Sequence, residues 1–243
     1  MGKVSSFAKG KVIGAARDKA AVGASEYAPG ASAKVVHDSL HRALNGGGPL
    51  PPAVEAAEEH LRDHDGDAEA AIRSWVRNHI ALAGAQGLLT NLGGVTTSLV
   101  SIPANLVGLT VVQARMVAGI AHLRGYDIDD PRVRDAALAT LLGEDRVRDL
   151  VRRRRIPAPP MALAPAPEHD PSLAPVIAAE VASELITRIA GRRVVTQVGR
   201  RVPVLGGAVA GSTDAWSTRS LGTYASRELR SRPAASRGPR RSR

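Results

Sequence analysis

Two pairs of histidines stand four residues apart, the spacing of zinc ligands on one face of a helix: His60 with His64, and His37 with His41. The metalloprotease motif also requires a glutamate directly after the first histidine, where the first pair has Leu61. Acidic residues surround this pair, but their spacing does not fit the calcium loop of an EF-hand. We therefore interpret both pairs as solvated polar positions and expect no metal site and no cofactor.

The sequence contains no cysteine, which excludes thiol nucleophiles, disulfides and cysteine-ligated zinc or iron. It also contains no nucleophile elbow of the form Gly-x-Ser-x-Gly, no Walker A loop and no dinucleotide-binding glycine motif between a strand and a helix. Any chemistry would have to use oxygen and nitrogen side chains. We therefore name no catalytic residue from motifs.

Four polar residues interrupt otherwise apolar stretches and are better candidates for a site. Burial of these residues is costly unless each finds a hydrogen-bond partner. They are Asn105, Gln113, Arg115 and Asp214. We expect Asp214 or Asn105 to meet Arg115 across packed helices. Such a cluster would either specify the register of the helices, which is the more common role of buried hydrogen bonds, or form a ligand site.

The elements that would position these residues are expected to be helices. Hydrophobic residues make up 44% of the 243-residue chain, whereas aromatic residues make up 2%. Strands are enriched in aromatic and β-branched side chains, while this chain takes its apolar residues mainly from alanine, leucine and valine. We therefore predict an all-α fold, in which a compact multi-helix domain carries flexible basic N-terminal and C-terminal arms.

Turn and capping residues divide the chain into helices. Gly125 is expected to end one helix in the left-handed conformation. Asp130 followed by Pro131 is expected to begin the next, because aspartate accepts hydrogen bonds from free amides and proline fits the first turn. Gly143 is expected to close that helix. The helices predicted in this way span residues 31–44, 53–62, 68–89, 101–124, 131–142, 144–155, 176–202 and 205–226.

The 37 residues from Asn78 to Ala114 contain no Asp, Glu, Lys or Arg. At about 1.5 Å per residue, a helix of that length would cross a bilayer of roughly 30 Å. Glycines, Pro103 and several polar residues interrupt the stretch, so we do not expect a single transmembrane helix. Two buried helices joined at Gly93-Gly94 fit better, with a hairpin at the membrane interface as the alternative.

Composition divides the chain into three parts. Residues 1–52 are expected to form a basic arm and a linker rich in glycine and proline, residues 53–226 a helical domain, and residues 227–243 a disordered arginine-rich tail. Within the domain, residues 156–175 contain seven prolines. We predict an extended linker there and no helix.

Positive charge is concentrated at both ends of the chain. The formal net charge is +10, and residues 203–243 alone carry eight basic and two acidic residues. Such an excess attracts anionic partners, a nucleic acid or the cytoplasmic leaflet of a membrane, unless the arms only keep the protein in solution. The scarcity of aromatic residues argues against sequence-specific nucleic acid binding. The candidate contacts with an anionic surface are Arg152, Arg153, Arg154, Arg155, Arg230, Arg232, Arg240, Arg241 and Arg243.

Several short motifs between residues 70 and 228 together resemble the EcsC family. They are Leu92-Gly93-Gly94, Ile102-Pro103 at the start of an apolar helix, Gly125-Tyr126-Asp127, and Val202-Pro203-Val204-Leu205-Gly206-Gly207. The resemblance implies a mostly helical protein that serves as an accessory to an ABC transporter, and it transfers no catalytic residue. This chain departs from the family pattern at Ala104-Asn105, because an acidic residue is common after the proline.

These observations favour an accessory or interaction protein, located in the cytoplasm or peripherally on the inner face of the membrane. Its expected partner is an anionic membrane surface or a membrane transporter component. The bias toward Ala, Arg, Gly and Pro is typical of GC-rich bacterial genomes, and Lys9, Lys11 and Lys19 interrupt the apolar core that a secretory signal requires. The alternative is an uncharacterised enzyme, hydrolase-like, with its site among the polar residues of the central helices.

Overall fold

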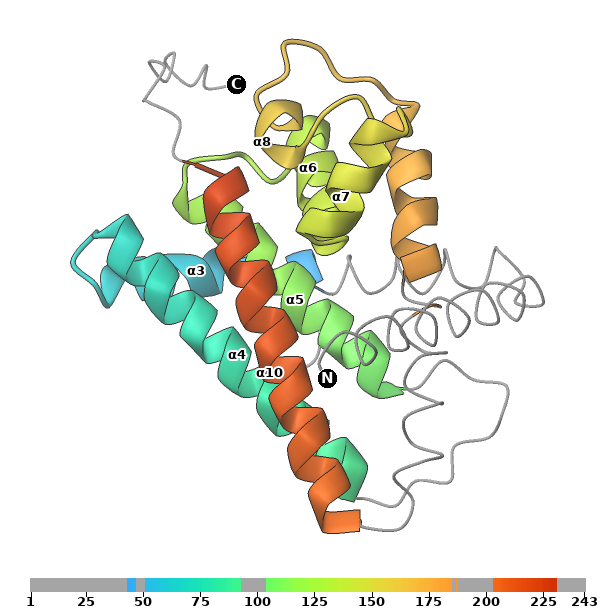
Figure 1. Ribbon diagram of the computed structural model, residues 1–243. Coiled ribbons are helices and arrows are strands. Elements are labelled where there is room, and N and C mark those ends of the chain that lie inside the picture. The colour runs from blue at the N-terminus through green and yellow to red at the C-terminus, as the bar shows by residue number, and fades with distance from the viewer. Residues whose placement is uncertain (1–42, 47–50, 93–103, 185–186, 188–202, 231–243) are drawn as a thin grey trace, which may run out of the picture.

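A computed structural model describes residues 43–46, 51–92, 104–184, 187 and 203–230 (Figure 1). These residues form helices joined by turns and loops, with no strand among them, which confirms the predicted all-α fold. Residues 173–184 form one of the helices. The others, in chain order, are α3 (Ala53–Arg62), α4 (Ala68–Leu92), α5 (Ala104–Leu123), α6 (Pro131–Leu141), α7 (Glu144–Arg152), α8 (Pro160–Leu163) and α10 (Pro203–Glu228).

Three long helices form the centre of the molecule. α4 and α10 lie side by side and make the most extensive contact in the fold, and α5 packs against both (Figure 1). A Cβ atom on Gly211 would lie 2.8 Å from the carbonyl oxygen of Gly84, and one on Gly222 would lie 2.8 Å from Val76. The order of these contacts shows that α4 and α10 are antiparallel. Small residues at these positions therefore let the two backbones approach closely.

Trp75 fixes α4 against α5. Its indole is 2% exposed, and its Nε1 donates a hydrogen bond of 3.0 Å to the carbonyl oxygen of Met116. The ring fills the space beside Gly119, where an added Cβ would clash with it. Ile72, His79 and Ala83, which share this face of α4, are buried as well.

The helices α6, α7 and α8 gather at one end of this central group (Figure 1). The predicted caps are confirmed: the side chain of Asp130 accepts a hydrogen bond from the backbone N–H of Arg132 at 2.9 Å. Gly125 and Gly143 have positive φ angles of 83° and 80°, a conformation that glycine adopts without steric cost. These caps end α5 and begin α6 and α7 near the residues that the sequence indicates.

The proline-rich segment is not the extended linker that we predicted. α8 occupies part of it, and the helix over residues 173–184 begins inside it. Pro160 is the first residue of α8 and Pro175 lies in the first turn of the next helix, where the missing N–H removes no helical hydrogen bond. Ile156, Leu163 and Ala164 are buried in the main core. Their burial holds the segment against the domain.

Both predicted arms contribute residues to the core. Ala43 is fully buried although it precedes the predicted start of the domain, and Leu229 is fully buried although it follows the predicted start of the tail. The hydroxyl of Tyr126 donates a hydrogen bond of 2.9 Å to the carbonyl oxygen of Arg230. Of the helix predicted over residues 31–44, only its last two residues are described, and they are helical. The rest of both arms lies outside the described residues.

No helix in the described part of the chain has the length and hydropathy needed to cross a bilayer. The uncharged stretch contributes its ends to α4 and α5, which pack against each other. Its expected joint at Gly93-Gly94 lies outside the described residues.

Candidate functional site

The structure gives Arg115 different partners from those predicted. Its guanidinium donates hydrogen bonds to the carbonyl oxygens of Pro51 and Pro52, at 2.5 and 3.4 Å, and lies 5.8 Å from the ring centre of Trp75. Burial lowers the pKa of Arg115. Arg115 therefore fastens the residues that precede α3 to the central helices, and its contacts have a structural role.

Helix geometry explains the difference. Asn105 and Arg115 both belong to α5, ten residues and thus about 15 Å apart, so they do not face each other across two helices. Gln113 faces α10, where its amide nitrogen lies 3.3 Å from the hydroxyl oxygen of Thr218. Arg115 follows Gln113 by two residues, about 200° around the helix, and so faces away from α10. Asp214 is fully buried on α10, and the side chain of Asn105 lies outside the described residues.

His79 is a deeply buried titratable group beside Arg115 and Trp75. Its Nδ1 lies 2.8 Å from the carbonyl oxygen of Trp75, so this nitrogen carries the proton, and Nε2 has no hydrogen-bond partner among the described residues. The two rings lie 4.2 Å apart between centres. Burial lowers the pKa of His79 to about 4. The imidazole is therefore neutral at pH 7 and acts as part of the core.

His60 and His64, at the end of α3 and in the turn that follows it, form contacts within the local structure. Nδ1 of His64 lies 2.8 Å from the carbonyl oxygen of His60, and Nε2 of His60 lies 3.3 Å from the amide nitrogen of Asn78. Among the residues that the structure describes, no group of three His, Asp or Glu side chains has the geometry of a metal site. His37 and His41 lie outside those residues.

A carboxylate–imidazole pair that the sequence did not suggest joins α6 to the proline-rich segment. Nε2 of His169 lies 3.1 Å from Oδ2 of Asp135, which is almost fully buried. Burial raises the pKa of Asp135. Arg132 holds the same segment by donating a hydrogen bond of 2.5 Å to the carbonyl oxygen of Ala166. The Asp135–His169 contact and the hydrogen bond of Arg132 thus hold the proline-rich segment against α6.

The predicted arginine cluster at the end of α7 is partly engaged within the protein. Arg153 and Arg155 form ion pairs with neighbouring carboxylates at 3.0 and 3.1 Å, while Arg152 and Arg154 are exposed. Of the C-terminal candidates, Arg230 is exposed beyond the end of α10. The remaining candidates lie outside the described residues: Arg232, Arg240, Arg241 and Arg243.

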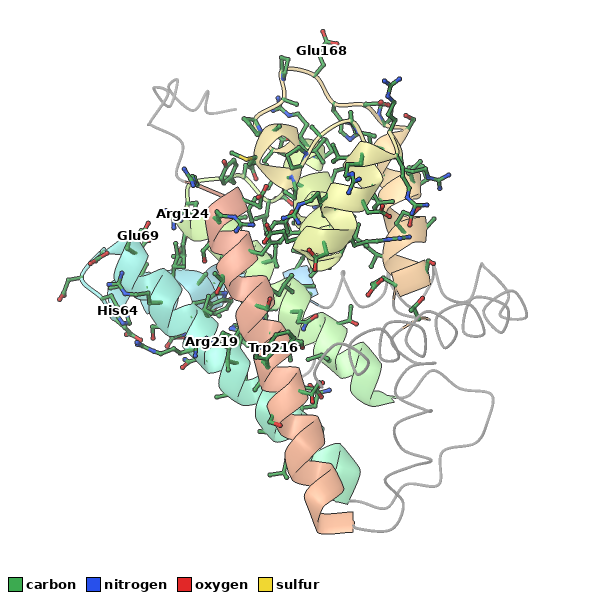
Figure 2. The ribbon with its side chains drawn as sticks, in the orientation of Figure 1. His64, Glu69, Arg124, Glu168, Trp216 and Arg219 are labelled. Atoms are coloured by element: carbon green, nitrogen blue, oxygen red, sulfur yellow. The ribbon has the colours of Figure 1, made fainter. Side chains whose placement is uncertain are left out.

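A second basic surface, which we did not predict, lies on α4 and α10. We call it the outer face and define it by eight exposed residues: Arg73, Arg77, Ala81 and Leu88 of α4, and Ser212, Trp216, Arg219 and Thr223 of α10. Spacings of three, four and seven place each set on one side of its helix. Both sets flank the α4–α10 contact on the side away from α5. Trp216 and Arg219 lie one turn apart on α10 (Figure 2).

The outer face carries three arginines that no ion pair among the described residues engages. Arg73, Arg77 and Arg219 form no ion pair with any residue that the structure describes. Apart from Glu69 in the first turn of α4 and Glu228 at the end of α10, the described residues of these two helices include one acidic residue. It is Asp214, which is fully buried. The eight residues of this surface therefore offer three exposed guanidinium groups and no carboxylate of their own, although Asp67, directly before α4, interacts electrostatically with Arg73.

Comparison of the chain with protein-family models, with curated proteins and with solved structures finds no match. Membership of the EcsC family, which the short motifs suggest, stays a prediction. The geometry of the outer face is therefore the main evidence for a function.

Proposed function

We propose that this protein is an accessory protein that binds the anionic surface of the inner membrane face through the outer face of α4 and α10. The observation that carries the proposal is the set of three exposed arginines without an ion-pair partner among the described residues, Arg73, Arg77 and Arg219. A basic residue near an anionic leaflet contributes about 1 kcal/mol, so three contribute roughly 3 kcal/mol. That corresponds to about 100-fold in membrane partitioning.

The pairing of other arginines supports this choice of surface. A guanidinium that already binds a carboxylate gains less from a lipid phosphate, because the internal pair must be broken or shared. Elsewhere among the described residues, most exposed or partly exposed arginines have such partners. Those with a carboxylate within ion-pair distance are Arg124, Arg132, Arg134, Arg146, Arg148, Arg153, Arg155 and Arg227. The short EcsC-like motifs favour an action from the cytoplasm beside a membrane transporter.

The hydrolase alternative has less support. In the central helices, Gln113 and Thr218 contact each other across the α5–α10 interface, and Arg115 binds backbone carbonyls. The carboxylate of Asp135 and the imidazole of His169 are a combination that general-base sites use. They lie on α6 and the proline-rich segment, however, and not on the central helices where the alternative places its site. We therefore do not propose an enzymatic function.

Co-sedimentation of the full chain with lipid vesicles tests the proposal. The vesicles contain phosphatidylcholine alone or phosphatidylcholine with phosphatidylglycerol. We expect binding to the anionic vesicles at low salt and weaker binding as salt increases, because exposed charges are screened. The variant R73Q/R77Q/R219Q should bind about 100-fold more weakly.

The matched control is R134Q/R148Q/R153Q, which removes the same charge from three exposed arginines that have carboxylate partners. It should bind nearly as well as the unmodified chain. Absence of binding to anionic vesicles at low salt would overturn the proposal. An equal loss in both triple variants would also overturn it, since binding would then follow net charge and not the outer face.

A further inference from the structure

Trp216 is the one large aromatic side chain on the outer face, and it is 71% exposed. Tryptophan is usually well buried, because its large apolar surface is costly to hydrate. The other tryptophan of the chain, Trp75, follows this rule at 2% exposure. The exposure of Trp216 therefore points to a partner that the described residues do not supply.

The neighbours of Trp216 leave its indole uncovered. Residues three and four positions away are the neighbours on a helix surface. For Trp216 these are Ser212, Thr213, Arg219 and Ser220, all exposed, and three of the four are small. Trp216 therefore projects from a surface of small side chains, and Arg219 is the one large side chain among these neighbours.

Apolar and basic residues are ordered along the outer face. Leu88, which is 39% exposed, lies beside Gly211 of α10. Going along α10 toward its C-terminus, Trp216 comes next, followed by Arg219, with Arg77 of α4 beyond it. One end of the face therefore presents apolar side chains and the other end presents guanidinium groups.

We infer that the outer face inserts into the headgroup layer of an anionic bilayer, with Trp216 at the boundary of the acyl chains. This inference rests on the proposed function and adds insertion to electrostatic attraction. Tryptophan favours the membrane interface, where its ring is in an apolar region and its N–H remains hydrated, and neighbouring arginines bind lipid phosphates. A single aromatic residue provides no series of stacking positions, so this surface fits a bilayer better than a nucleic acid. α4 and α10 then lie along the membrane plane.

Tryptophan fluorescence of the full chain tests the insertion, because Trp216 is the exposed one of the two tryptophans. On addition of vesicles of phosphatidylcholine and phosphatidylglycerol, the emission should shift to shorter wavelength. Lipids brominated in the upper acyl chain should quench it. The variant W216F should lose most of the wavelength shift, since the remaining Trp75 is buried.

Binding of W216S to the same vesicles measures the contribution of the indole. Burial of a large apolar side chain corresponds to about tenfold or more in partitioning, so W216S should bind at least that much more weakly. The matched control is M161S, because Met161 is also exposed, at 48%, but lies on α8 away from the outer face. M161S should bind like the unmodified chain, and the circular dichroism of both variants should be unchanged.

The outcomes separate insertion from the proposed function. If anionic vesicles bind the chain without a wavelength shift, and W216S binds equally well, the insertion is wrong and the electrostatic proposal stands. If duplex DNA shifts the emission and vesicles do not, the partner is a nucleic acid and the insertion is again wrong. If vesicles do not bind at all, both proposals are wrong together.

Discussion

Acid should destabilise this protein through His79. Burial lowers the pKa of this residue from 6.5 to about 4 in the folded state, whereas the unfolded chain takes up a proton near the ordinary value. Above pH 6.5 both states are neutral at this position, so His79 adds no pH dependence. As the pH falls from 6.5 to about 4, only the unfolded state becomes protonated. The free energy of unfolding then decreases by about 1.4 kcal/mol per pH unit, roughly 3 kcal/mol in total.

Urea unfolding followed by circular dichroism measures this effect in the unmodified chain and in H79Q. Near neutral pH the variant should be less stable, because glutamine loses the ring contact with Trp75. As the pH decreases, this difference in stability should shrink by roughly 3 kcal/mol, because only the chain with histidine loses stability by proton uptake in the unfolded state.

The control is I120V, which removes a methyl group from the fully buried Ile120 and adds no titrating group. Its stability should differ from that of the unmodified chain by the same amount at every pH. H79L serves as a second variant without a titrating side chain. If the stability of both His79 variants ran parallel to that of the unmodified chain down to about pH 4, the reasoning from burial would be refuted.

Three further changes test the packing, each by urea unfolding. G119A should cost about 1–3 kcal/mol, because its Cβ would meet the indole of Trp75; an unchanged stability would contradict this packing. G211V should cost at least as much, because its Cβ would lie 2.8 Å from the carbonyl oxygen of Gly84, and a stable variant would show that α4 and α10 separate easily. A chain ending at Glu228 should be about 2–5 kcal/mol less stable than one ending at Arg230, because it lacks the buried Leu229; equal stabilities would place Leu229 outside the core.

Most helix boundaries could be predicted because they depend on neighbouring residues. α3 begins and ends at the predicted residues, and the cap of α6 at Asp130 is the predicted one. A capping side chain binds amides two or three residues away, and a glycine in the left-handed conformation ends a helix by its own backbone preference. Such interactions are visible in a short stretch of sequence.

The proline-rich segment shows where this local reasoning failed. Its prolines correctly exclude a long helix, but the short helix α8 forms within it, and Ile156, Leu163 and Ala164 are buried in the core. The partners that hold it, Arg132 and Asp135, lie about thirty residues earlier in the chain. Contacts of this kind depend on how α6 is oriented, which no local pattern indicates.

The candidate site was missed for a related reason. We expected Asp214 or Asn105 to meet Arg115, but the position of Arg115 around the axis of α5 directs it toward the residues before α3. The outer face combines Arg77 from the first third of the chain with Arg219 from its end. Their proximity follows from the close contact of Gly84 with Gly211, which sets the two helices side by side.

The amino-acid sequence by itself determined the helical fold class, most of the helix ends and the sign of the charge, because helical hydrogen bonds and caps join residues close together in the chain. Only the tertiary structure decided which arginines have partners and which apolar residues are exposed, because these depend on the faces that packed helices turn toward each other. The two tryptophans show the difference: both stand in helices, yet Trp75 fills the α4–α5 interface and Trp216 projects from the outer face.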